Sequence, residues 1–467
     1  MSSGGNDKLD EIVKLNALIF CGLNSSAFRM GFRIRTETLD VIFIAFWLVL
    51  ASTTVCQAQG VDFGNPAAPP PPPVFAPPPS PPGVLWSLTN LSQSSGVTLS
   101  GIYTGEVLAN VNGGIRTGTI AEGLLELDLD IDLAKSIGLK GGSFHFAGFE
   151  IHGSSLSNGY TGDLSGVSSI AGFNTARIAE YWYEQSLFDD RFSFRIGQFL
   201  TENEFYYSDY SNLFICGSFG AYTFLVNNFP FAPSYPMSAP GIRLLLRAMA
   251  QLDFKIGIYS GSTLSEQQNN SSLPNIREKD GIMTFWETDY RINQEKDGTG
   301  LPGTYKLGFM FHSRYDGALN SNPGSLDRSG YGFYLTIDQA IWQKNMADKQ
   351  VKAPRLGVFC RLGYMPPEFG FVSRYIDGGF NYNGLFPGRN DDIFGVGITH
   401  SGISREANSN RVTESRFTSE TTIEVTYKAQ LTSWLSLQPD FQYIINPGAT
   451  SAGRNATVIG VRSTLTF

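Results

Sequence analysis

Carboxylates and an aromatic ring recur in this chain at a spacing of two residues. Glu180, Trp182 and Glu184 follow one another in this way, and Arg195 lies on the strand that we expect next. Side chains two residues apart on a β-strand point to the same side, so the two carboxylates and the indole should face one way. Carboxylates accept hydrogen bonds, a guanidinium donates them, and an indole offers an apolar face for stacking. Such a wall could bind a hydroxyl-rich solute weakly and reversibly.

Other charged side chains fall on faces of the same kind in other predicted strands. Beside the four residues above, the candidates are Glu106, Glu122, Glu126, Arg177, Arg243, Lys306, Arg361 and Glu424. We expect them to line a water-filled passage and to contact the solute. The competing explanation for each one is that it only hydrates the wall or pairs with a neighbouring charge.

The element that would position these residues is the β-strand. In 119–133, TIAEGLLELDLDIDL, one face is leucine and isoleucine, and the other carries glutamate and aspartate. The segment 457–467 alternates in the same way and ends in Phe467. A period of two indicates a strand with one apolar and one polar face. A soluble protein can contain such a strand, so the repetition of the pattern along the chain carries the argument.

The alternating pattern predicts sixteen strands separated by turn signals. The predicted strands are 97–110, 119–133, 142–152, 176–186, 191–201, 240–249, 251–261, 282–291, 303–315, 330–343, 355–365, 372–384, 392–404, 419–430, 434–445 and 457–467. An even number of strands places both ends of a barrel on the same side of a membrane, here the periplasmic side.

The composition favours a membrane barrel. Charged residues make up only 16% of the chain, below the roughly 25% of soluble domains. The chain has 35 Phe, 20 Tyr and 51 Gly. The predicted fold class is therefore all-β: a transmembrane antiparallel β-barrel of about sixteen strands, wide enough for an aqueous channel. A soluble β protein would have to hide an apolar face on every one of these strands.

The longest gap between predicted strands runs from Glu202 to Ala239 and is rich in aromatic residues. Loops longer than about 15 residues are usually functional or disordered, and this composition argues against disorder. We expect the segment to fold into the lumen as a constriction loop. The alternative is an extracellular loop packed on itself.

The N-terminal part of the chain predicts export. The one continuous apolar run, VIFIAFWLVLA at 41–51, is too short to span a bilayer and is typical of a signal-peptide core. We expect a signal peptide over 1–58, with translation starting at Met30 and cleavage before Gln59. Residues 59–94 form a Pro-rich linker, which favours polyproline II and serves as a semi-rigid periplasmic spacer. Contact of this linker with the cell wall or a periplasmic partner is the alternative, and 95–467 forms the barrel.

Several other function classes are disfavoured. The formal net charge is −8, and no basic patch indicates a nucleic-acid partner. The sequence lacks G-x-S-x-G, H-E-x-x-H and paired C-x-x-C motifs, and its histidines are dispersed, so we expect no enzyme, no cofactor and no metal site. A glycosidase-type carboxylate pair is the chemical alternative, but no two carboxylates are isolated in an apolar setting.

Several segments resemble the carbohydrate-selective porins of the OprB family, in the family's order. They are GVTLSGIYTGEVLANVNGGIRTG, RIAEYWYEQSLFDDRFSFRIGQF, SYPMSAPGIRLL, LPGTYKLGFMFHS, YIDGGFNYNGLFPGRNDDIFGVGITHSGIS and LSLQPDFQYIINPG. The resemblance covers about residues 95–467, and the Pro-rich segment and the long N-terminus depart from the family's pattern. It implies a sixteen-stranded barrel in the bacterial outer membrane that passes glucose and other small sugars by passive diffusion. The implied partners are mono- and oligosaccharides and outer-membrane lipid.

A general, non-selective porin is the alternative function. The surplus of acidic residues on the predicted inner faces argues against selectivity for anions. The choice between sugars and general use rests on the resemblance, because the alternating pattern is the same for both. The sequence leaves open whether the chain forms a homo-oligomer.

Overall fold

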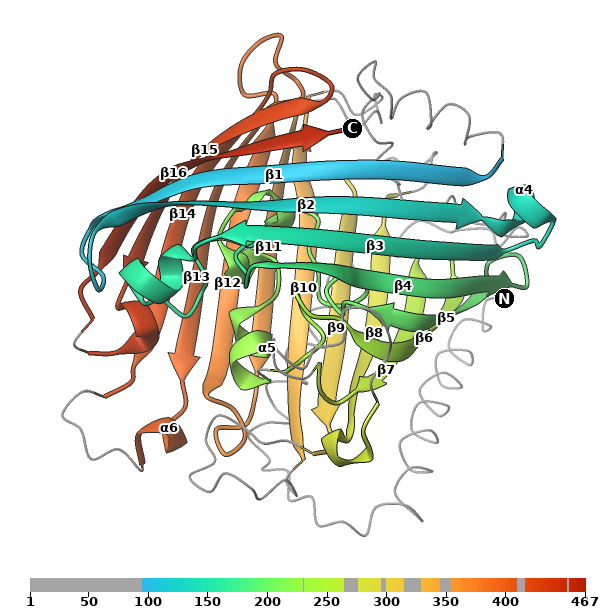
Figure 1. Cartoon of the computed structure of the whole chain (residues 1–467), viewed down its shortest axis with the longest axis horizontal. Helices are drawn as coiled ribbons and strands as arrows, with labels where there is room; N and C mark the ends of the chain where they lie inside the picture. The colour runs from blue at the N-terminus through green and yellow to red at the C-terminus, as the bar shows by residue number, and fades with distance from the viewer. Residues whose placement is uncertain are drawn as a thin grey trace, which may run out of the picture. The chain divides into compact units, whose positions relative to one another are not determined.

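Sixteen antiparallel strands close into one barrel among the residues that the structure describes. The computed structural model describes residues 95–229, 231–263, 276–294, 300–314, 329–344, 354–409, 416–451 and 453–467. Each strand pairs with its neighbours in the chain, and β1 pairs with β16 to close the ring (Figure 1). The predicted signal peptide, the Met30 start and the Pro-rich linker lie outside the described residues.

The observed strands match the predicted ones along the whole barrel. They are β1 (Val97–Asn112), β2 (Gly118–Asp132), β3 (Gly142–Gly153), β4 (Thr175–Leu187), β5 (Phe192–Phe199), β6 (Ala239–Met249), β7 (Leu252–Ser260), β8 (Ile282–Ile292), β9 (Gly303–His312), β10 (Gly330–Gln343), β11 (Arg355–Tyr364), β12 (Val372–Asn383), β13 (Ile393–Ile403), β14 (Ser419–Gln430), β15 (Leu435–Ile445) and β16 (Ala456–Thr466). The largest difference is at the end of β9, which was expected at 315 and is found at His312.

The helices of the described residues are short and lie between strands. They are α4 (Leu133–Ile137), α5 (Thr223–Asn228) and α6 (Glu406–Ser409), with η1 (Ser157–Thr161), η2 (Ser211–Leu213), η3 (Gly217–Phe219), η4 (Glu278–Asp280) and η5 (Pro447–Ala449). Within the described ranges, no helix has the length and apolar character needed to cross a membrane.

Side chains alternate between the inside and the outside of the barrel along each strand. On β1, Glu106 and Leu108 are buried inside, whereas Val107 between them is 50% exposed on the outer wall. Aromatic and aliphatic side chains dominate the outer wall, and polar side chains are frequent on the inner wall, which is the pattern of an outer-membrane barrel. The predicted fold class is confirmed. A side-chain period of two lets each strand present apolar side chains to lipid and polar side chains to the water inside.

The hairpin of β4 and β5 brings an acidic and a basic residue together. The connecting turn is tight, with Phe188, Asp189 and Asp190 all at positive φ. Aspartate tolerates this backbone conformation better than most residues, which favours the turn at this point of the chain. The resulting register sets Glu184 directly opposite Arg195.

A β-bulge in β4 turns Arg177 and Glu180 to the same side. The register of β4 against β3 shifts there and leaves Ala179 as an extra residue. Without the bulge, residues 177 and 180 would lie on opposite faces. Both are buried inside the barrel, and the guanidinium of Arg177 lies 5.1 Å from the ring centroid of Phe173.

Candidate functional site

The described residues of segment 200–238, between β5 and β6, fold into the barrel. Its aromatic side chains form the largest hydrophobic cluster among the described residues, together with inner-wall residues such as Tyr334 and Tyr375. The α5 helix packs beside β12, where the amide of Asn228 exchanges two hydrogen bonds with the backbone of Val372 at 2.8 Å (Figure 1). The expectation of an inward-folded loop is confirmed. The burial of this many aromatic side chains strongly favours the inward position.

Charged side chains of the inner wall hold the backbone of segment 200–238. The carboxylate of Glu424 accepts hydrogen bonds from the amides of Ile215 at 2.6 Å and Cys216 at 2.9 Å. The guanidinium of Arg361 donates to the carbonyl of Ser218 at 2.8 Å. Buried backbone groups must find partners, and these wall side chains provide them where no strand is available.

Further wall residues anchor the same segment. Glu287 accepts from the amide of Tyr206 at 2.7 Å, and Lys306 donates to the carbonyl of Tyr207 at 2.9 Å. The ammonium of Lys306 also lies 3.1 Å from the centroid of the Tyr207 ring. Of the sequence candidates, Arg361, Lys306 and Glu424 therefore have partners within the barrel wall and its loop, and the structure does not bring them to the group around Trp182.

A second segment, 154–174 between β3 and β4, also lies against the inner wall. Glu420 of β14 accepts hydrogen bonds from the amides of Leu164 and Ser165, both at 2.8 Å, and Gln442 of β15 donates to the carbonyl of Val167 at 2.9 Å. The sequence analysis did not identify this segment as inward-folding. Its length, beyond the range of ordinary connections, was the available signal.

Trp182 lies on the inner wall and is contacted by a guanidinium group and an imidazole ring. The guanidinium of Arg195 lies 3.5 Å from the indole centroid on the β5 side. On the β3 side, the imidazole of His145 stacks on the indole with a centroid distance of 4.8 Å. We call these three residues the His–Trp–Arg stack. Arg195 and His145 therefore contact the indole from the two neighbouring strands, which leaves less of the ring open for stacking than the sequence suggested.

Two carboxylates and two guanidinium groups form an ion-pair group beside the stack. Glu184 binds Arg195 at 2.7 Å and Arg243 at 2.8 Å. Glu204 of segment 200–238 binds Arg243 at 2.8 Å and also pairs with Arg195. Burial alone would raise the pKa of Glu204, but the two guanidinium groups hold that pKa below its ordinary value. The group is balanced in charge, and it fixes the orientation of the arginine that covers Trp182.

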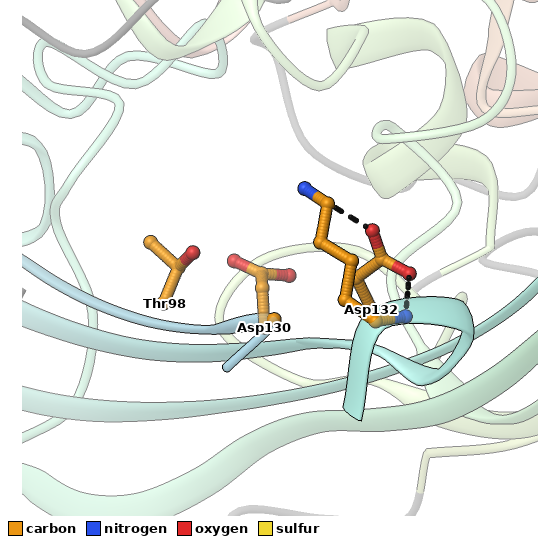
Figure 2. A pocket seen from close by; sticks show the side chains of 5 residues that line it. Thr98, Asp130 and Asp132 are labelled. Atoms are coloured by element: carbon orange, nitrogen blue, oxygen red, sulfur yellow. Dashed lines mark hydrogen bonds and ion pairs between the residues drawn. The ribbon is translucent and has the colours of Figure 1, made fainter. Parts of the chain in front are cut away.

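Carboxylates of β2 continue from the stack toward one rim of the barrel. Asp130 lies 2.7 Å from Nδ1 of His145, and Asp128 lies 3.9 Å from Nε2. Figure 2 shows the hollow at the rim, where Thr98, Asp130 and Asp132 point into open space beside the start of α4. Asp132 caps this helix by accepting from the amide of Lys135 at 3.2 Å. We call Glu126, Asp128, Asp130 and Asp132 the β2 carboxylates.

The register aligns these residues in two adjacent rows. Asp130 of β2 is the direct cross-strand neighbour of His145, which in turn neighbours Trp182. In the next row, Glu184, Arg195 and Arg243 are neighbours across β4, β5 and β6. The structure therefore brings five of the sequence candidates together at one place: Glu180, Trp182, Glu184, Arg195 and Arg243.

The remaining candidates lie on the inner wall nearby. Glu106 forms an ion pair with Arg462 of β16. Glu122 is buried, and Glu126 is partly exposed on the same face of β2. The sequence analysis did not select His145, Asp130 or Glu204, although His145 falls on the inward face of a predicted strand. Its contact with Trp182 depends on the pairing of two strands, which a single strand's pattern does not contain. Among the described residues, no three His, Cys, Asp or Glu side chains could together hold a metal ion.

Comparisons with known proteins agree with this architecture. The model of the carbohydrate-selective porins of the OprB family matches residues 116–467. Porin B of Pseudomonas aeruginosa is 25% identical over 408 residues, which cover 78% of this chain and 86% of that protein. The high-pH structure of Pseudomonas putida OprB has a TM-score of 0.71 at 20% identity and covers 81% of this chain and 96% of its own. The low-pH structure has a TM-score of 0.53 at 18% identity and covers 83% and 98%.

These likenesses agree in fold and extend over nearly the whole barrel. The family match covers well over half of the chain, and the barrel with its inward-folded segment fits a channel rather than an enzyme. The chain therefore belongs to the OprB family of carbohydrate-selective porins, and it is a sugar-selective porin of the bacterial outer membrane.

Proposed function

We propose that this porin selects neutral sugars at the inner wall formed by the His–Trp–Arg stack, the ion-pair group and the β2 carboxylates. The observation that carries the proposal is the row of Asp130, His145 and Trp182, which sets an exposed carboxylate beside a fixed aromatic stack. The side chain of Asp130 is 53% exposed, and its Oδ1 binds His145, so its other oxygen can accept hydrogen bonds from a passing solute.

The chemistry of this wall suits hydroxyl groups. The β2 carboxylates accept hydrogen bonds, and His145 and Arg195 carry N–H groups in the same two rows of the wall. Each contact replaces one that the hydroxyl made to water, so binding is weak in net terms and does not block diffusion. In this proposal Trp182 positions Arg195 and His145 and does not itself stack on the sugar. Glu180 has the same positioning role, since it accepts from Asn203 of the inward segment at 3.2 Å.

Charge gives the second criterion of selection. The ion-pair group is balanced in charge, whereas Asp128 and Asp130 of the β2 carboxylates add negative charge to the wall. Anions of similar size should be repelled, and neutral solutes should not. Selection at this wall therefore acts against anions and in favour of hydroxyl-rich solutes, including glucose and small oligosaccharides.

The test is osmotic swelling of liposomes that contain the purified protein. We compare glucose, a disaccharide and an amino acid of similar size for the wild type, for Trp182→Ala with Glu184→Gln, and for a matched control, Trp286→Ala with Glu278→Gln. Trp286 lies on the outer wall and Glu278 in η4, so the control removes the same groups away from the lumen. We expect the wild type and the control to prefer sugars and the Trp182 and Glu184 variant to lose that preference.

Influx that follows solute size alone in the wild type would contradict selectivity and favour a general porin. A preference that survives in the Trp182 and Glu184 variant would place selection elsewhere on the wall. Both outcomes can be distinguished from misfolding, because the folded barrel migrates differently from the heat-denatured chain in gel electrophoresis.

Export and membrane contacts complete the proposal. A signal peptide over 1–58 directs the chain to the periplasm, and the Pro-rich linker over 59–94 remains there as a spacer in front of the barrel. Exposed apolar residues of the outer wall, such as Leu244, Trp286 and Ile398, contact outer-membrane lipid. N-terminal sequencing of the protein from outer membranes should begin at Gln59, and another start would refute the proposed cleavage.

A further inference from the structure

The inner face of β2 leads to a hollow at one rim of the barrel. The residues that line the hollow are Gly96, Thr98, Asp130, Asp132 and Lys135 (Figure 2). Its volume is about 320 Å³. Sites for small molecules in proteins have volumes of roughly 300–1,000 Å³, so the hollow is large enough for one small solute.

The rim that holds the hollow is the periplasmic one. Its connections between described strands include short turns, for example 188–191 and 250–251, whereas both inward segments start and end at the opposite rim. Outer-membrane barrels have short periplasmic turns and longer extracellular loops. A solute on its way into the cell therefore meets the hollow after it has passed the inward segments.

The backbone around the hollow is fixed by a close approach at Gly96. This glycine has a φ of +78°, and a Cβ there would lie 2.7 Å from both the carbonyl oxygen of Asp132 and the Cβ of Lys135. The amide of Asp132 donates to the carbonyl of Gly96 at 2.7 Å. The ammonium of Lys135 lies 3.4 Å from the Asp132 carboxylate and offsets its charge. The hollow is therefore built from paired strands and a capped turn.

The carboxylates beside the hollow leave a surplus of negative charge. Nδ1 of His145 lies 2.7 Å from Asp130, and Nε2 lies 3.9 Å from both Asp128 and Glu180. One imidazole thus serves three carboxylates, so negative charge remains on the wall even when His145 is protonated. The side chains of Asp128 and Asp130 are 25% and 53% exposed, which leaves them within reach of a solute.

Hydroxyl groups flank these carboxylates on the neighbouring strand. Thr98 of β1 is the direct cross-strand neighbour of Asp130. Ser100 has the same relation to Asp128. Direct neighbours in a sheet lie about 5 Å apart, so one carboxylate and one hydroxyl can contact two substituents of the same sugar ring. Figure 2 shows Thr98 and Asp130 pointing into the same open space.

We propose that the channel admits amino sugars, whose amine is protonated, faster than neutral sugars of the same size. The inference rests on the proposed function, because an amino sugar must pass the inward segments as any sugar does. The ammonium group of the solute binds Asp130 or Asp128, and its hydroxyls exchange hydrogen bonds with Thr98 and Ser100. The negative wall also raises the local concentration of a cationic solute. These contacts are exposed to water and weak, so the solute is released to the periplasm.

The test measures uptake of radiolabelled glucosamine and glucose by liposomes that contain the purified full chain. The medium is slightly acidic, which keeps the amine protonated. Equal potassium chloride on both sides with valinomycin prevents the entering cation from building up a voltage. We expect the initial rate for glucosamine to be about two- to fivefold higher than that for glucose, the range that one exposed ionic contact provides.

Variants locate the effect on the wall. Asp128→Asn with Asp130→Asn removes the acidic partners, and we expect the rate for glucosamine to fall to that for glucose. Asp189→Asn with Asp190→Asn, in the turn between β4 and β5, is the matched control and should keep the preference for glucosamine. The gel shift of the folded barrel shows that each variant is folded. A preference that survives Asp128→Asn with Asp130→Asn would overturn the assignment to these carboxylates.

Two further solutes separate this inference from the proposed function. Equal rates for glucosamine and glucose, with glucose still faster than a neutral amino acid of similar size, would refute the preference for amino sugars and leave the proposed function intact. Equal rates for glucose and the amino acid would contradict the proposed function, and the inference would fail with it. Tetraethylammonium that enters as fast as glucosamine would also refute the inference, because positive charge alone would then account for the uptake.

Discussion

The guanidinium of Arg195 lies over the indole of Trp182, 3.5 Å from the ring centroid, and is held there by ion pairs to two carboxylates. One of these carboxylates, Glu184, belongs to the same strand as Trp182, and the other, Glu204, belongs to the inward segment. The contact therefore joins the barrel wall to the segment that narrows the lumen.

Arg195→Lys should weaken this junction while keeping the charge. Lysine cannot stack on the indole or bind two carboxylates in a planar fork, so we expect the free energy of unfolding to fall by about 1–2 kcal/mol. Urea unfolding followed by the gel shift of the folded barrel measures the change. Arg277→Lys, at an ion pair with Asp280 outside the strands, is the control and should change stability by less. Equal losses in the two variants would mean that stacking on Trp182 contributes nothing specific.

Glu424→Ala should loosen segment 200–238. The substitution leaves the buried amides of Ile215 and Cys216 without an acceptor, which costs about 2 kcal/mol or more. We expect larger current fluctuations in planar bilayer recordings, because the segment moves within the lumen. Val425→Ala changes the next residue on the outer face of the same strand and should leave the recordings as in the wild type. Steady currents in Glu424→Ala would show that the other anchors suffice.

The stability of the inward segment should depend on pH through Glu202. Burial raises the pKa of Glu202 from 4.5 to about 7 in the folded protein, where the carboxylate accepts from the amide of Tyr235. Below pH 4.5 the group is protonated in both states. As the pH rises toward 7, the unfolded chain ionises first, so the free energy of unfolding falls, by up to about 3 kcal/mol.

Glu202→Gln removes this titration, and the measurement is the difference in unfolding free energy between the wild type and the variant from pH 4 to pH 8. We expect the wild type and Glu202→Gln to have the same free energy of unfolding at low pH, and Glu202→Gln to have the larger one at high pH. A difference that stays constant across this range, or that changes in the opposite direction, would exclude Glu202 as the titrating group.

The β2 carboxylates should set the charge preference of the channel. Asp128→Asn with Asp130→Asn removes two negative charges from the lumen, so we expect the ratio of potassium to chloride permeability to fall. The reversal potential in a gradient of potassium chloride gives this ratio directly. Asp189→Asn with Asp190→Asn removes two charges from the turn between β4 and β5 and keeps residues that tolerate positive φ. If the control lowers the ratio as much, the lumen charges are not responsible.

The strands and the orientation of their side chains were predictable because the information is local. A period of two along a single strand identifies its lipid-facing and lumen-facing sides, and it correctly placed Glu180, Trp182 and Glu184 inside. Arg177 is the instructive case, since the bulge at Ala179 puts it on the same side as Glu180 although their spacing alone would not. A bulge is stabilised by pairing with the neighbouring strand and leaves little trace in one sequence.

The inward segments were predictable only in part. The aromatic content of 202–239 indicated burial, and that prediction is confirmed. The segment 154–174 has few aromatic residues. Inside the barrel, Leu156, Val167 and Ile170 pack in hydrophobic clusters with the wall, and Glu420 and Gln442, far along the chain, form hydrogen bonds with its backbone. Neither the sequence of 154–174 nor the sequences around Glu420 and Gln442 specify this contact, because these parts of the chain meet only when the barrel closes.

The sequence by itself determined the barrel, the number of its strands and, except across the bulge in β4, which residues face the lumen, because each of these follows from alternation and turn signals within a few residues of chain. The tertiary structure decided what those residues do there. It turned Arg361, Lys306 and Glu424 into anchors for an inward segment. It also enclosed Trp182 between His145 and Arg195. These roles depend on register and on contacts between distant segments, and such contacts exist only once the ring of strands has closed and the loops have packed inside it.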